Sequence, residues 1–183
     1  INRLGLDEVN EGGISATYGY EYTKTDRSNF NEKMKFGFAN NLRFEENKDL
    51  PANSNLGDKV SDFVGFVEYN PSENIKIDYN FSLKKNLVDQ NYELFGFEYY
   101  FKNLTTKFEY LNENNSNSNI SYLQNKTSYK LNDKNSLVFE TRENKEKNFT
   151  EYYNLIYQFQ NDCLTAAIEL SLIHISEPTR LAT

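Results

Sequence analysis

The sequence predicts an all-β fold, an antiparallel up-and-down meander of about ten strands. Three observations support this prediction. Apolar and polar residues alternate with a period of two, turn-forming residues cluster between the alternating segments, and the connections alternate between short and long. The alternation is clearest in NIKIDYNFSLK, residues 74–84, where every second side chain is apolar. An extended chain with this pattern has one apolar and one polar face.

Ten segments are predicted as strands. In chain order they are residues 13–24, 33–44, 61–69, 75–84, 91–101, 104–111, 120–130, 136–143, 149–160 and 163–170. The first alternates Tyr with Ser, Thr and Glu, the second Phe with Lys and Asn, and the ninth Tyr and Leu with Asn and Gln. The fifth is partly apolar on both faces, so its orientation stays open. Clusters of Asn, Asp, Gly, Ser and Pro, which favour turns, separate the segments.

The connections indicate the kind of sheet. Four are tight turns, at residues 70–74, 102–103, 131–135 and 160–162, and between them lie the longer polar stretches 45–60, 86–90, 112–119 and 144–148. Short turns at one end and long loops at the other are typical of outer-membrane barrels, whose short turns face the periplasm. A strand of about ten residues, at roughly 3.3 Å each and tilted near 45°, rises about 23 Å, close to the apolar band of such barrels.

Composition narrows the class of protein. The net charge is -7 and the Lys and Arg residues are scattered, which argues against a nucleic-acid partner. No run of about eighteen apolar residues exists, so no transmembrane helix is predicted. Aromatic residues make up 15% of a chain with a mean hydropathy of -0.78. A soluble sandwich or lipocalin-like barrel would need Val, Ile and Leu for its core, whereas Tyr and Phe on the apolar face better match an interfacial girdle.

We therefore expect a slice of a large transmembrane outer-membrane β-barrel in residues 1–170. If the short turns are periplasmic, both ends of this meander lie outside, whereas a complete barrel is expected to keep both in the periplasm. Residues 171–183, SLIHISEPTRLAT, break the alternation and resemble a translated sequencing adapter. We predict that this tail is not native, and we exclude His174 from any catalytic site.

The sequence predicts no enzyme chemistry. Without His174 the chain has no histidine for a catalytic triad and no Cys/His ligand set, and it has no Gly-rich loop that could hold a phosphate. No catalytic residue, metal ligand or cofactor is therefore assigned.

Three stretches resemble, in order, the C-terminal barrel of the LptD family, the lipopolysaccharide-assembly proteins also called organic solvent tolerance proteins. They are RLGLDEVNEGG (3–13), DLPANSNLGDKVSDFVGFVEYNPSENIKIDYNF (49–81) and YYNLIYQFQNDCLTAAIEL (152–170). The most specific parts are residues 50–65 and the pair Asp162–Cys163. The resemblance implies a Gram-negative outer-membrane translocon that inserts lipopolysaccharide (LPS) into the outer leaflet. Its implied partners are LPS, an LptE-like lipoprotein plug, outer-membrane lipid, and a periplasmic LPS bridge reached through an N-terminal domain.

The resemblance also gives Cys163 a role. Family members carry one or two cysteines on a periplasmic turn near the last strands, linked by disulfide to the N-terminal domain. The alternation of turns independently puts Cys163 on the periplasmic side, which is oxidising. Leu164 follows it, so one bridge at most is implied, to a partner outside this chain. A free thiol is the alternative.

A hydrated lumen is the last expectation. We assign to it six polar residues, which suit hydrogen bonding to a plug, to sugars and to phosphates, or which simply solvate the interior. They are Lys76, Asp78, Lys107, Glu109, Asn154 and Gln158. A porin-type passive channel remains the alternative function, against which Cys163 argues. A soluble or surface β-sheet binding protein is a weaker one.

Overall fold

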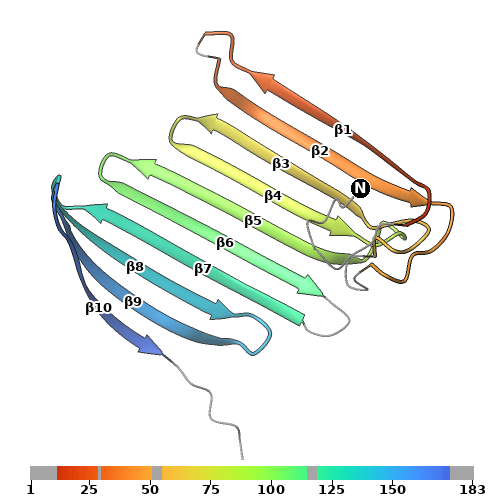
Figure 1. The fold of residues 1–183 in the computed structure, drawn as a ribbon. Helices are drawn as coiled ribbons and strands as arrows, with labels where there is room; N and C mark the ends of the chain where they lie inside the picture. Colours follow the sequence, from red (N-terminus) through yellow and green to blue (C-terminus); the bar gives the residue numbers. More distant parts are fainter. Residues whose placement is uncertain (1–11, 29, 51–54, 115–118, 174–183) are drawn as a thin grey trace, which may run out of the picture.

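The computed structural model describes residues 12–28, 30–50, 55–114 and 119–173, and it shows one antiparallel sheet of ten strands in chain order (Figure 1). The strands are β1 (Ser15–Thr25), β2 (Glu32–Arg43), β3 (Phe63–Ser72), β4 (Ile75–Leu83), β5 (Gln90–Phe101), β6 (Leu104–Asn114), β7 (Asn119–Lys130), β8 (Asn135–Asn144), β9 (Phe149–Gln160) and β10 (Thr165–Ile173). The predicted all-β meander is confirmed. No helix in this described part is long and apolar enough to cross a membrane.

All ten predicted strands form, and three of them extend three residues beyond their predicted ends. β3 continues to Ser72 and β6 to Asn114. β10 continues to Ile173 rather than residue 170, because Leu172 keeps the alternation and pairs with Tyr153 on β9. The first three residues of the predicted tail therefore belong to the sheet, and residues 174–183 lie outside the described residues. That residues 171–183 are not native stays a prediction.

The sheet is curved and open. Each strand pairs only with its sequence neighbours, and the sheet curls on its β8–β10 side (Figure 1). Within the described residues, β1 and β10 do not pair with each other. The sheet thus has the curvature of a barrel wall without closure.

Tight turns lie at one end of the sheet, which we call the turn end; the opposite end is the loop end. Asparagine shapes two of these turns, because the Asn132 side-chain oxygen accepts backbone N–H groups at 134 and 135, and Asn161 does the same at 163 and 164. Just after β1, Ser28 donates side-chain and backbone hydrogen bonds to Asp26, which lowers the pKa of that carboxyl. The turn is therefore favoured above the carboxyl's ordinary pKa and loses this contribution as the pH falls through the lowered value.

Glycines let neighbouring groups approach the strands closely. Phe66 lies opposite Gly37, and a Cβ atom at Gly37 would lie 2.7 Å from the Phe66 ring. A Cβ atom at Gly19 on β1 would lie 2.6 Å from the backbone oxygen of Phe38 on β2. The first contact can be relieved by turning a ring, but the second requires a shift of the backbone.

Replacing Gly19 by Ala should lower the free energy of unfolding by about 1–3 kcal/mol, because β1 and β2 must separate to admit the methyl group. The matched control is Gly12→Ala, where nothing lies within 4 Å of the new Cβ. Urea unfolding in detergent micelles measures both variants. Equal free energies of unfolding for the two variants would contradict the close approach of β1 and β2.

Candidate functional site

The pairing register sorts the side chains onto two faces of opposite chemistry. On one face, which we call the apolar face, Tyr79 aligns with Val67 on one side and Phe95 on the other. On the other, the polar face, Asp78 aligns with Glu68 and Gly96. The register therefore settles the orientation of β5, since Phe95 aligns with Tyr79.

The apolar face remains exposed. Side chains along it keep a large fraction of their surface accessible, 53% for Tyr20, 45% for Leu155 and 68% for Ile168. Among the described residues only Leu50 and Val138 are buried hydrophobic side chains. A soluble sandwich would cover such a face with a second layer. This sheet does not bury its aromatic and aliphatic residues in a core of its own.

The apolar residues of this face form a band that crosses the sheet diagonally. At the turn end the band begins with Tyr22 on β1 and with Phe159 on β9. The row of paired residues that contains Tyr22 runs through Tyr79 to Glu143 on β8, where the face has become polar at the loop end. The band thus shifts by about one residue per strand, which for strands about 4.8 Å apart means a tilt of about 35°. Transmembrane barrels tilt their strands by roughly 35–45°.

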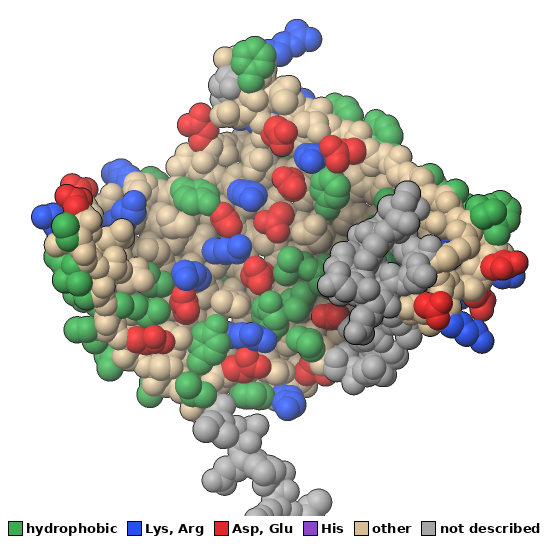
Figure 2. Space-filling view, in the orientation of Figure 1, with side chains coloured by type: hydrophobic (Ala, Val, Ile, Leu, Met, Phe, Trp, Pro, Cys, Tyr) green, Lys and Arg blue, Asp and Glu red, His purple; other side chains and the backbone are tan. Residues whose placement is uncertain are grey.

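The polar face carries a row of charges that we call the charged row. Neighbours in this row pair across consecutive strands from β4 to β10. The row consists of Lys76, Glu98, Lys107, Lys126, Glu140, Asn154 and Ser171. Figure 2 shows Lys, Arg, Asp and Glu side chains mixed over the middle of the hollowed face.

Ion pairs link the members of the charged row. Lys107 Nζ lies 3.3 Å from Glu98 Oε1, and Lys126 Nζ lies 2.6 Å from Glu140 Oε1. Lys107 also approaches Glu109 on its own strand, at 3.7 Å. In the next row towards the loop end, Arg142 Nε lies 2.8 Å from Glu151 Oε2. Charges of both signs therefore neutralise one another across neighbouring strands.

The six residues predicted to line a lumen all lie on the polar face. Lys76, Lys107 and Asn154 belong to the charged row, whereas Asp78 and Glu109 flank Gly96 in the adjacent row. Nearer the turn end, Gln158 pairs with Ser136. The register brings these six residues onto one face, and their role in a lumen stays a proposal.

Sequence reasoning missed a polar network at the loop end. The segment between β2 and β3 contributes Ser61 and Asp62, which lie against Asn40 and Asn41 of β2. These four side chains and that of Arg43 are buried. Arg43 Nε donates to the backbone oxygen of residue 56 over 2.6 Å. The strong turn composition of residues 45–60 predicts a loop, but nothing in it predicts which strand residues the loop will contact.

A change of register explains the role of Asn40. Between the pairs Ala39–Val64 and Leu42–Val60, β2 advances by three residues and the facing segment by four, so one residue bulges. The Asn40 amide donates to the backbone oxygens of Ser61, at 2.9 Å, and of Asp62, at 3.2 Å. It thereby satisfies carbonyl groups that the bulge removes from the ladder.

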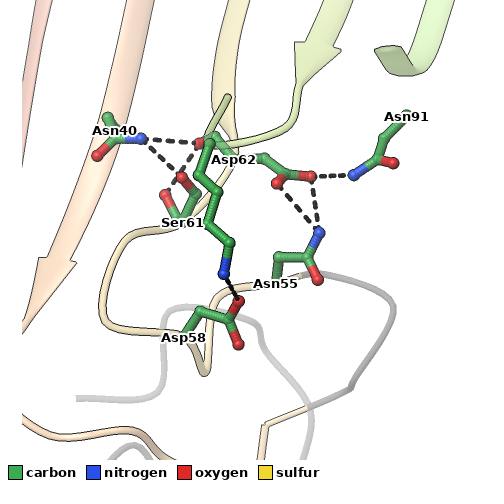
Figure 3. A network of polar contacts seen from close by, with 7 residues as sticks. Asn40, Asn55, Asp58, Ser61, Asp62 and Asn91 are labelled. Atoms are coloured by element: carbon green, nitrogen blue, oxygen red, sulfur yellow. Dashed lines mark hydrogen bonds and ion pairs between the residues drawn. The ribbon is translucent and has the colours of Figure 1, made fainter. Parts of the chain in front are cut away.

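Asp62 connects this segment to β4 and β5 (Figure 3). Its carboxylate accepts two hydrogen bonds from the Asn55 amide, each 3.0 Å, one from Asn91, and one of 3.4 Å from Ser82. All of these donors are neutral. Nearby, Asp58 makes a more exposed ion pair of 3.2 Å with Lys85.

Cys163 lies exposed in the turn between β9 and β10, at the turn end, with no disulfide partner among the described residues. Its bridge to a partner outside this chain stays a prediction. The described residues contain no group of three His, Cys, Asp or Glu residues placed to hold a metal ion.

Replacing Asp62 by Ala should lower the free energy of unfolding by about 1–3 kcal/mol, because the part-buried Asn55 and Asn91 amides lose their acceptor. It should also make residues 44–62 more sensitive to protease. The control Asp58→Ala removes a solvent-exposed pair worth about 0–1 kcal/mol. Denaturant unfolding and limited proteolysis measure both effects, and a larger effect of the control would contradict the central place of Asp62.

Comparison with known proteins identifies a family. The family model LptD, LPS transport system D, matches residues 4–135, which is more than half of the chain. No curated protein matches the chain. The match includes β1–β7 and ends at the first residue of β8, so Cys163 lies beyond it. The chain belongs to the LptD family, LPS transport system D.

Proposed function

We propose that this sheet is part of the wall of an outer-membrane translocon that inserts LPS into the outer leaflet. The observation that carries the proposal is the pairing of a diagonal apolar band on one face with neutralised charges on the other, in a chain of an LPS transport family. The two faces, together with membership in a family of outer-membrane proteins, also support an outer-membrane location. In this arrangement the chain transports rather than catalyses.

The apolar face contacts outer-membrane lipid. Its exposed Tyr, Phe, Leu and Ile side chains suit acyl chains, and the eight inner strands β2–β9 pair with a neighbour on both sides, as a lipid environment requires of backbone groups. The tilt of about 35° inferred from the apolar band supports this assignment, since it lies at the lower end of the tilts of membrane barrels.

The polar face lines the lumen. Lys76, Asp78, Lys107 and Glu109 offer charged donors and acceptors, and Asn154 and Gln158 offer amides, which suit an LptE-like plug and the sugars and phosphates of LPS. These residues lie at different heights on one face, which is the arrangement that a solvated passage needs.

Cys163 forms a disulfide with a partner domain outside this chain, through which the periplasmic LPS bridge delivers its cargo. Its exposed place in a tight turn at the turn end supports this role, because a partner can reach the thiol there. The turn end is then the periplasmic end, an oxidising compartment.

A porin-type channel is the second candidate, because a charged lumen suits passive diffusion equally well. Family membership favours LPS transport over this alternative. The two candidates also differ in what fails when the protein is lost.

Depleting the protein should lower the amount of LPS at the cell surface and leave uptake of small solutes through other channels unchanged, because LPS would lose its route to the outer leaflet. Antibody labelling of surface LPS and a solute-uptake assay measure the two effects. Normal surface LPS with reduced solute uptake would instead support the porin alternative.

Replacing Leu155 by Lys should destabilise the protein in the membrane by about 2–4 kcal/mol, because the ammonium group would enter the apolar band. The control Asn154→Lys changes the next residue of the same strand, which lies on the polar face, and should have little effect. The fraction of protein that keeps heat-modifiable gel mobility measures assembly. Equal effects would mean that the apolar face does not contact lipid.

A further inference from the structure

The charged row contains two like charges on neighbouring strands, and the ion pairs of the row do not account for their placing side by side. Lys107 on β6 lies directly opposite Lys126 on β7. Side chains at such positions have Cβ atoms about 4.5–5.5 Å apart, and like charges there are destabilising. Glu98 and Glu140 flank the two lysines on β5 and β8, so the order across four strands is negative, positive, positive, negative.

The exposure of these side chains differs by sign. Lys107 and Lys126 are 43% and 55% exposed, whereas their partners Glu98 and Glu140 are 17% and 16% exposed. The carboxylates thus lie low against the sheet and the ammonium groups stand above them. A ligand that approaches the polar face at this place meets positive charge first, although the row is nearly neutral.

The lysines also keep donors for a ligand. An ammonium group has three N–H donors. Lys126 contacts one carboxylate in the described structure, and Lys107 contacts those of Glu98 and Glu109. An anion can therefore bind between the two lysines without displacing the glutamates.

Polar groups on both sides of the pair extend this surface. In the row towards the loop end lie Gln124 and Arg142, and in the row towards the turn end lie Thr105 and Ser128. Hydroxyl and amide groups beside cations suit a sugar that carries a phosphate, since they offer donors and acceptors to its hydroxyls.

We propose that Lys107 and Lys126 form a binding site for a phosphate group carried on a saccharide. The site deepens the proposed function and rests on it, because the phosphorylated saccharide would be that of LPS in transit along the polar face. Glu98 and Glu140 hold the lysines upright and limit their affinity, so that a bound phosphate is released again.

Photo-crosslinking tests this site in the full chain in outer-membrane vesicles. A photoreactive residue at Gln124 reports on the polar face beside the lysines, and one at Leu123 reports on the apolar face as a background. The probe is purified LPS, offered either phosphorylated or after enzymatic dephosphorylation. We expect crosslinking at Gln124 to be about tenfold stronger with phosphorylated LPS, as the loss of a charge-assisted contact implies.

Variants then separate the lysine pair from general electrostatics. Lys107→Gln with Lys126→Gln should remove the preference for phosphorylated LPS, whereas Lys107→Arg with Lys126→Arg should keep it. Lys134→Gln, in the exposed β7–β8 turn, is the matched control and should change nothing. Glu98→Gln with Glu140→Gln should strengthen crosslinking, because the lysines lose their competing carboxylates. Heat-modifiable gel mobility confirms that each variant has assembled.

The outcomes distinguish this site from the function on which it rests. If crosslinking at Gln124 depends neither on the phosphorylation of LPS nor on the two lysines, the proposed site is wrong, but the proposal of LPS transport is unaffected. An absence of LPS crosslinking at Gln124 in the assembled unsubstituted protein would count against both. At matched ionic strength, a phosphorylated saccharide should compete with LPS crosslinking better than inorganic phosphate or phosphatidylglycerol vesicles do. Equal competition by all three would overturn the assignment of the site to a saccharide phosphate.

Discussion

The pairing register between neighbouring strands is the constraint on which the structure depends. Side chains alternate between faces, so a slip by one residue would move every side chain of a strand to the other face. Nine consecutive pairings keep Tyr79 with Phe95 and Tyr110 on one face, and Lys107 with Lys126 on the other. The separation of lipid-like and water-like chemistry, the diagonal band and the charged row all follow from this agreement between strands.

Local pattern was enough to predict the strands. All ten were placed from the alternation and turn residues, and the six polar residues assigned to a lumen fall on one face because period-two spacing fixes the face within each strand. The end of β10 was predicted too early, since the change in composition after residue 170 concealed three residues that still alternate and pair.

What the sequence could not reveal depends on contacts between distant residues. Asp62 meets Asn91, and Asn40 reaches around a bulge to Ser61, and neither contact has a local signal. The opposition of Lys107 and Lys126 depends likewise on the register between β6 and β7, which the alternation within each strand does not determine. The polar network at the loop end also reverses an ordinary expectation, because amides and a carboxylate are the buried groups here while aromatic rings are exposed.

Each strand pairs only with its neighbours in the sequence, and this has an evolutionary consequence. Two strands joined by a tight turn form a unit whose contacts are local, and local contacts favour rapid formation. Duplication or deletion of one such hairpin would change the circumference of a barrel by two strands while leaving every other register intact. Barrels of very different diameter can therefore arise from one another by copying a gene segment of some twenty-five codons, about the length of two strands with a turn.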